Sequence, residues 1–293
     1  MVSTSRFQKI IRDYYRLQGR DLPWRRTRDP YRILVSEVML QQTQVARVEG
    51  FYGHFLKKFP DFRALAAAKA VDVLRAWQGL GYNRRALALH RLAKEIVRKN
   101  GGALPRSRAA LEALPAIGPY TAGAVLAFAF DQPELFIETN IRRVFIHFFF
   151  PKRRKVRDDE IKVLLKKTFP GFRHARSRPA HPDGNKNPLS MSHYPLARFW
   201  YYALMDYGAM LGATEKKNPN RRSAHYVKQS KFAGSDRELR GKILRLLLER
   251  KHVWKRELGN IIPESEKRLE RITDALVEEG FVLKMGNFLS LQV

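Results

Sequence analysis

The sequence predicts an all-α fold, followed by a small α+β domain at the C-terminal end. From residue 4 to about residue 280, apolar side chains recur at intervals of three and four residues, which is the period of helices that bury one face. Prolines and glycines interrupt this pattern and mark the turns between helices. No convincing strand pattern occurs before residue 280, whereas residues 281–293 contain two short apolar runs typical of a β-hairpin.

The expected helices can be placed in order along the chain. The first covers residues 4–18, and Pro23 lies in the loop after it because proline does not continue a helix. A largely apolar helix is expected over 33–46, and two further helices flank a turn at 115–119. The remaining helices are expected at 51–59, 64–68, 71–77, 84–100, 141–150, 237–251, 253–261 and 265–280.

Composition limits the classes of function. The 293 residues, 44% of them hydrophobic, are enough for two or three domains. The 56 lysines and arginines against 28 acids give a formal net charge of +28, which indicates a polyanionic partner, nucleic acid rather than membrane. The absence of cysteine excludes disulfides, a thiol nucleophile and thiolate-bound metal. Without a signal-type or membrane-spanning run, we expect a soluble intracellular protein, cytoplasmic and associated with the nucleoid.

Glu37 is the only charged residue in the apolar stretch 33–46. Burial of an unpaired carboxylate raises its pKa, so Glu37 is a candidate general acid. If the helix continues, Gln41 and Gln44 follow at i+4 and i+7 and place two amides on the same face. In the alternative interpretation, Glu37 is neutralised by Arg20, Arg25 or Arg26 and has no chemical role.

The second informative stretch runs from Leu111 to Phe130 and contains the turn 115–119. Gly118 allows a positive φ, and Pro119 occupies a first-turn position where no N–H is lost. Backbone N–H groups at the start of the second helix would then bind a DNA phosphate. The alternative is an ordinary helical hairpin.

Glu138 follows an apolar triplet, and Asn140 is expected to cap the next helix. Glu138 is therefore a candidate second carboxylate in apolar surroundings. The basic run 151–157 resembles a nuclear import signal, but in so basic a chain we expect a loop that faces DNA. Residues 171–198 are expected to form a long surface loop, whose irregularly spaced histidines indicate solvent or DNA contact rather than a metal site.

Several motifs together resemble the MutY-type adenine-specific mismatch DNA glycosylases, in the helix-hairpin-helix superfamily that also includes endonuclease III. The motifs are LPWRRTRDPYRILVSEVMLQQTQV, GLGYNRRA, LPAIGPYTAGAVLAFAF and ETNIRRV, within about residues 18–150, and FWYYALMDYGAML at 199–211. The resemblance implies a six-helix barrel over 21–133 and a second helical domain from 1–20 and 134–232. Residues 236–293 resemble a winged helix and not the Nudix-like domain by which MutY enzymes recognise 8-oxoguanine, so we expect this domain either to grip DNA or to dock on the rest of the protein.

The resemblance also implies roles for single residues. Glu37 would protonate the purine at N7, and Glu138 would stabilise positive charge on the sugar. Tyr120, Asn140, Arg20 and Arg25 match positions that line the active site. Gln41, Gln42 and Tyr82 match the wedge that fills the gap left by the flipped base, and Ala116, Ile117 and Gly118 match the hairpin that grips phosphate.

Three departures from the family pattern are visible. The family has aspartate at Glu138, so the carboxylate here is one methylene longer. Bifunctional relatives have lysine at Tyr120, and its absence predicts little or no AP-lyase activity. The four cysteines that usually hold an iron–sulfur cluster fall on Gly212, Pro219, Arg222 and Lys228, so we expect no cofactor, with Arg222 and Lys228 contacting DNA instead.

We therefore expect a monofunctional, monomeric DNA glycosylase of base excision repair. Its substrate would be double-stranded DNA with a mismatch or damaged base, adenine is the first expectation for the excised base, and no membrane is involved. Relatives without the Nudix-like domain leave thymine, uracil or hypoxanthine as alternative substrates. The change at Glu138 also leaves open a DNA-binding protein with weak or no catalysis.

Overall fold

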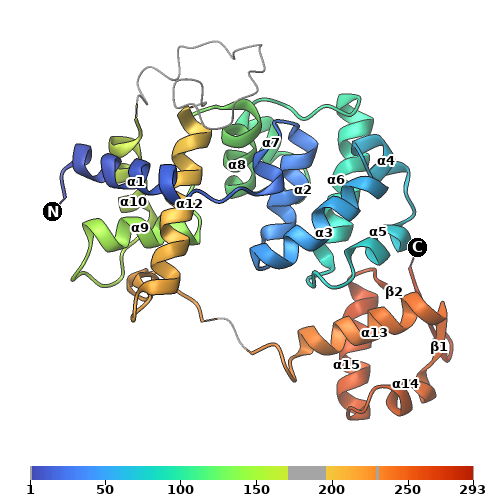
Figure 1. The fold of residues 1–293 in the computed structure, drawn as a ribbon. Coiled ribbons are helices and arrows are strands. Elements are labelled where there is room, and N and C mark those ends of the chain that lie inside the picture. The colour runs from blue at the N-terminus through green and yellow to red at the C-terminus, as the bar shows by residue number, and fades with distance from the viewer. Residues whose placement is uncertain (1, 171–195, 229–230, 293) are drawn as a thin grey trace. The chain divides into compact units, whose positions relative to one another are not determined.

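The computed structural model of the chain describes residues 2–170, 196–228 and 231–292 (Figure 1). These residues are mostly helical, with one small sheet near the C-terminal end, which confirms the predicted fold class. Most of the loop expected at 171–198 lies outside the described residues. No helix in the described ranges is long and apolar enough to cross a lipid bilayer.

The chain forms two compact units, and each contains segments that are distant in sequence. The first consists of Met1–Glu37 and Leu104–Lys228, and the second of Val38–Ala103 and Gln229–Val293. The predicted division into a barrel, a second helical domain and a winged-helix-like domain stays a prediction.

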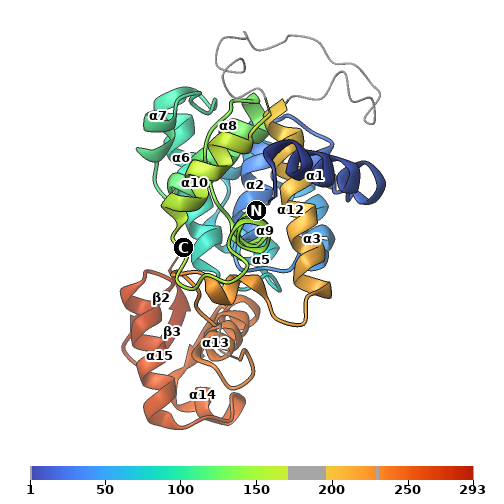
Figure 2. The same ribbon diagram turned by 90° about the vertical axis from the view of Figure 1, so that its left-hand side faces the viewer.

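Helix packing in the first unit is centred on α12 and α9. Figure 2 shows α12 beside α1 and α9, and the three helices enclose an aromatic core in which Phe7 contacts Phe145 and Trp200. Helix α8 is apolar on all sides and lies buried over most of its length. The helices of this unit are α1 (Thr4–Gln18), η1 (Pro23–Arg25), α2 (Pro30–Leu40, whose last residues belong to the second unit), α7 (Arg108–Glu112), α8 (Pro119–Phe130), α9 (Thr139–Phe149), α10 (Asp158–Thr168), α12 (Leu196–Thr214) and η2 (Pro219–Arg222).

The second unit combines four helices from the first half of the chain with the C-terminal domain. The helices are α3 (Val45–Lys58), α4 (Phe62–Ala67), α5 (Ala70–Trp77) and α6 (Arg84–Asn100). The C-terminal domain contains α13 (Asp236–Arg250), β1 (His252–Trp254), α14 (Lys255–Ile261), α15 (Glu266–Glu278), β2 (Val282–Met285) and β3 (Phe288–Leu291). Its antiparallel sheet has the order β1-β3-β2, so the three expected helices and the hairpin are present.

The strand β1 was not predicted, because no strand was expected before residue 280. It is only three residues long and pairs with β3, with Val253 opposite Leu289. Its ring contact, between Trp254 and Phe288, also depends on that distant strand. A strand this short has no period of its own in the sequence.

The helix predicted over 33–46 ends earlier than expected. Helix α2 stops at Leu40, Gln42 has a left-handed backbone (φ 59°), and Gln44 is the N-cap of α3. Arg85 Nη1 donates to the carbonyl oxygens of Val38 and Met39, at 2.8 and 2.9 Å, so these C-terminal carbonyls are satisfied by a side chain. The prediction that Gln41 and Gln44 lie on the helical face of Glu37 is therefore wrong.

Candidate active site

Glu37 is a buried acid whose hydrogen-bonding partner is a hydroxyl group. Its side chain is on α2, the residue is 4% exposed, and Oε2 accepts a hydrogen bond of 2.8 Å from the Tyr120 hydroxyl. Burial raises the pKa of Glu37 to about 7. The Tyr120 hydrogen bond opposes this shift, the charge of Glu138 adds to it, and Arg25 lowers it slightly. Glu37 can therefore hold a proton near neutral pH.

The arginines that were alternative partners of Glu37 bind other acids. Arg26 pairs with Asp21 at the surface. Arg20 and Arg25 both donate to Asp206, Arg20 Nε at 2.8 Å and Arg25 Nη2 at 2.7 Å. The interpretation of Glu37 as an ion-paired structural acid is therefore wrong.

Tyr120 lies in the first turn of α8 and is held by an edge-on ring contact with Phe136 at 5.7 Å between centroids. Burial, with the nearby charges of Glu37 and Glu138, raises the pKa of Tyr120 far above its usual value. Its hydroxyl therefore stays neutral and serves as a hydrogen-bond donor to Glu37.

Glu138 is the N-cap of α9. Its Oε1 accepts from the Ile141 backbone N–H at 2.7 Å, and its Oε2 accepts from Asn140 Nδ2 at 3.2 Å. The expected capping role of Asn140 is therefore wrong: the longer glutamate reaches the N–H groups itself. Burial raises the pKa of Glu138, whereas these hydrogen bonds and the charges of Arg143 and Arg142 favour its ionised form.

Glu37 and Glu138 interact with each other and with Tyr120 in the first unit, although about a hundred residues separate them in sequence. Two carboxyl groups that repel each other do not ionise together easily. Two hydrogen bonds and two nearby arginines favour the ionised form of Glu138, whereas burial favours the protonated form of Glu37. This arrangement supplies one acid and one anion in a single site.

Arg143 was not predicted, and it links Asn140 to the loop after α12. Its Nη1 donates to Asn140 Oδ1 at 2.7 Å, and its Nε donates to Asn218 Oδ1 at 3.2 Å. A Cβ on Gly212 would lie 2.5 Å from Arg143 Nη1, so this position accommodates only glycine without a shift. The side chain of Asn140 is thereby held between Glu138 and Arg143.

Asp206 is a second functional candidate that sequence reasoning missed. It is 2% exposed on α12 and accepts hydrogen bonds from Arg20 and Arg25, and the Arg20 backbone N–H donates to it as well. Burial alone would raise the pKa of Asp206, but the hydrogen bonds and charges of Arg25 and Arg20 lower it below its usual value. The signal was present in the sequence as a lone acid in the apolar run FWYYALMDYGAML.

The positions that match the family's cluster ligands cannot bind an iron–sulfur cluster here. None carries a thiolate, and the chain has no cysteine. Arg222 in η2 donates to the carbonyl oxygens of Pro151 and Ile146, and the backbone of residues 222–224 pairs with Val156. Lys228 is exposed. Among the described residues, no group of three or more histidines, aspartates and glutamates is placed to hold a metal.

The turn before α8 has the expected position but a different backbone. Gly118 is the N-cap of α8 with φ −89°, and the residue with positive φ is Ala116, at 64°. The prediction of a positive φ at Gly118 is therefore wrong. Ile117 is buried and fixes the turn, while Ala116 and Gly118 are exposed. No side-chain hydrogen bond caps the N-terminus of α8, which begins with Pro119 directly after Gly118.

The three predicted wedge residues lie in the second unit. The Tyr82 hydroxyl donates to Gln42 Oε1 at 3.1 Å, and both residues are exposed. The backbone carbonyl of Gln41 accepts a hydrogen bond from Arg85.

Comparisons with known proteins identify the family of this chain. Residues 35–170 match the family described as "HhH-GPD superfamily base excision DNA repair protein". The adenine DNA glycosylase of Mycolicibacterium smegmatis is 33% identical over 289 residues, which cover 92% of this chain and 90% of that protein. The adenine DNA glycosylase of Buchnera aphidicola is 38% identical over 143 residues, 49% of this chain, and the match spans only 41% of that relative's length. A solved thermostable thymine-DNA glycosylase superposes with a TM-score of 0.58 at 25% identity, covering 76% of this chain and 95% of the other.

Fold and site thus define a helix-hairpin-helix protein of base excision DNA repair. The similarity to the M. smegmatis adenine DNA glycosylase covers nearly the full length of that protein and identifies the family within this class. The chain belongs to the MutY-like adenine DNA glycosylases of the HhH-GPD superfamily. The resemblance predicted from the motifs is confirmed.

Proposed function

We propose that this protein is a monofunctional DNA glycosylase that flips adenine out of a mispair in double-stranded DNA and hydrolyses its N-glycosidic bond. The observation that carries the proposal is the pair of buried Glu37 and half-buried Glu138, in which Glu37 can hold a proton near neutrality and Glu138 accepts two hydrogen bonds. The relatives named adenine DNA glycosylase support adenine as the base.

Chemistry begins with proton transfer from Glu37 to N7 of the purine. The bond between the sugar and the base then breaks with its electron pair moving to the base, and positive charge develops on the sugar. Glu138 stabilises this charge electrostatically, and water completes the hydrolysis. Tyr120 holds the Glu37 carboxyl by its 2.8 Å hydrogen bond, and Asn140 holds Glu138.

The remaining predicted residues bind and position the DNA. Arg20 and Arg25, oriented by Asp206, line the base pocket. The turn of residues 116–118 binds a phosphate through the N–H groups at the start of α8. Gln41, Gln42 and Tyr82 form the wedge, and Lys228 contacts the DNA backbone from the loop that Arg222 anchors. One duplex binds one monomer.

AP-lyase activity requires an amine that forms a Schiff base with the sugar. Bifunctional relatives have a lysine for this purpose where this chain has Tyr120, so we do not expect lyase activity. Purified protein incubated with abasic-site DNA and borohydride should give little covalent product. An efficient covalent trap would contradict the monofunctional mechanism.

Thymine opposite guanine is a second candidate substrate, favoured by the structural similarity to a thymine-DNA glycosylase. A panel of duplexes with A:G, A:8-oxoG, T:G, U:G and hypoxanthine, scored for base release under single-turnover conditions, separates the candidates. Release from the adenine duplexes alone supports the proposal. Tight binding to a duplex without release from any member would instead identify a DNA-binding protein without catalysis.

A further inference from the structure

The pair of Gln42 and Tyr82 has an unusual backbone. Both residues have positive φ, at 59° and 50°, a backbone conformation that is unfavourable for a residue with a Cβ. Both side chains are nevertheless exposed and bonded to each other, at 3.1 Å between Tyr82 Oη and Gln42 Oε1. Strain maintained at an exposed polar pair indicates a surface built for a ligand.

Arg85 holds the two loops that carry this pair. Its Nη1 donates to the carbonyl oxygen of Gln41 at 2.5 Å, and its Nη2 donates to that of Gly81 at 3.0 Å. Burial lowers the pKa of Arg85 to about 10, so it remains charged at neutral pH. One guanidinium therefore joins the two loops that carry Gln42 and Tyr82.

The C-terminal domain adds a third polar group to this pair. Arg237, at the start of α13, places Nη1 2.5 Å from the Tyr82 hydroxyl and its Cζ 5.6 Å from the centre of the Tyr82 ring. The domain is fixed nearby, because Arg84 of α6 and Arg240 of α13 both donate to Glu279. This contact supports the docking role that was one of the two expectations for the domain.

In an ordinary winged helix, the third helix enters a DNA groove. The corresponding helix here, α15, is poorly suited to bind DNA, because most of its cations are paired with acids. Two of its three basic residues, Arg268 and Arg271, pair with Asp236. Lys284 on the hairpin pairs with Asp274 of the same helix. Arg237 differs from these residues because it contacts Tyr82 of the wedge.

We propose that Arg237 is a specificity-determining residue that binds the base opposite the excised adenine, through the O6 and N7 acceptors of guanine. The inference rests on the proposed function. A wedge inserted into a duplex stands in the place of the flipped base and beside its former partner. An arginine at the polar end of that wedge can donate two hydrogen bonds to guanine O6 and N7, the commonest specific contact in the major groove. 8-Oxoguanine carries a hydrogen on N7 and cytosine lacks this acceptor pair, so neither accepts both bonds.

The test compares adenine release and duplex affinity for A:G, A:8-oxoG and A:C, using the full chain and Arg237→Gln, with Arg237→Lys as the variant that keeps the charge. We expect Arg237→Gln to lower affinity and adenine release for the A:G duplex by roughly 5- to 150-fold, and to change both quantities little for the A:8-oxoG and A:C duplexes. Arg237→Lys should also lose selectivity, since an ammonium group cannot form the paired contact.

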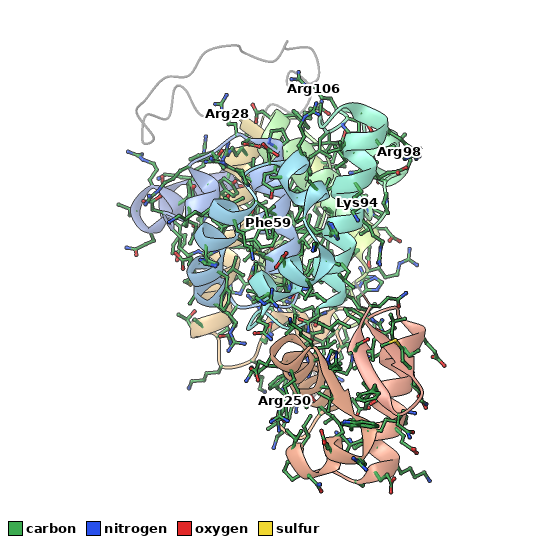
Figure 3. All side chains as sticks on the ribbon, turned by 90° about the vertical axis from the view of Figure 1, so that its right-hand side faces the viewer. Arg28, Phe59, Lys94, Arg98, Arg106 and Arg250 are labelled. Atoms are coloured by element: carbon green, nitrogen blue, oxygen red, sulfur yellow. The ribbon has the colours of Figure 1, made fainter. Side chains whose placement is uncertain are left out.

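Arg250, labelled in Figure 3, lies at the other end of α13 from Arg237. Arg250→Gln is the matched control, because it removes the same charge about 20 Å away, at a rise of about 1.5 Å per helical residue. This control should leave the ratios of affinity and of adenine release between the three duplexes unchanged. Melting curves of each variant test whether it is folded. An equal loss on all three duplexes would show a phosphate contact and overturn the proposal, as would no change. If the wild type releases no adenine from any duplex, the proposed function fails, and the affinity ratios still test Arg237.

Discussion

Replacement of Glu37 by glutamine should abolish catalysis and stabilise the protein at alkaline pH. The pKa of Glu37 is about 7 in the folded state against 4.5 for an ordinary glutamate, a difference of about 2.5 units, or roughly 3 kcal/mol. Between these values the folded protein holds a proton that the unfolded chain has released. The free energy of unfolding therefore falls as pH rises through this window, and the stabilising contribution is lost above pH 7.

Glutamine in the same place accepts the Tyr120 hydrogen bond without a charge to bury. The difference in melting temperature, Glu37→Gln minus wild type, should therefore grow in favour of the variant between pH 4.5 and pH 8.5. The expected change in this difference is roughly 6–12 °C for a folded unit of this length. Glu49→Gln, on the exposed side of α3, controls for the amide substitution itself. If the difference in melting temperature between Glu37→Gln and wild type does not change with pH, Glu37 is not a buried acid with a raised pKa.

Activity tests the same proton independently. If Glu37 is the acid, the single-turnover rate of adenine release should be constant well below pH 7 and fall about tenfold per pH unit above it. Glu37→Gln should lose roughly 10²- to 10⁴-fold in this rate at all pH values. Full activity in this variant would remove Glu37 from its role.

Three other substitutions test the neighbours of Glu37. Tyr120→Phe removes a donor that favours the ionised form, so the pH at which activity falls should move upward by roughly 1–2 units, as measured in the pH–rate profile. Glu138→Gln removes the anion, so the release rate should fall roughly 10²- to 10³-fold while duplex affinity is maintained; an unchanged rate would contradict electrostatic stabilisation by Glu138. Asp206→Asn leaves buried Arg25 without its carboxylate, so thermal unfolding should show a loss of roughly 3–5 kcal/mol, and a neutral effect would show that Arg25 finds another partner.

The sequence predicted those elements whose causes are local. The helix expected at residues 4–18 is α1 with the same bounds, because Ser3 caps it and its apolar face has helical period. The start of α8 was predicted within one residue, because Pro119 tolerates the first position of a helix. The acid in the apolar run at Glu37 was recognised because burial of a carboxylate has the same consequence in any fold.

Features that depend on distant partners were not predictable. Helix α2 ends at Leu40 because Arg85, which follows it by more than forty residues, binds its last carbonyl groups. Single-sequence patterns contain neither the identity nor the position of such partners.

Glu37 and Asp206 show how the partner decides what a buried acid does. Each is the only acid in an apolar helical run, so the sequence gives them the same interpretation. Glu37 meets the hydroxyl of Tyr120, which offers one neutral hydrogen bond, and burial raises its pKa to about 7. Asp206 meets Arg20 and Arg25, whose charges outweigh burial and keep it ionised. Glu37 can therefore hold a proton near neutrality, whereas Asp206 stays charged and binds two arginines. The partners that separate the two acids, Tyr120 for one and Arg20 and Arg25 for the other, are brought to them by tertiary packing.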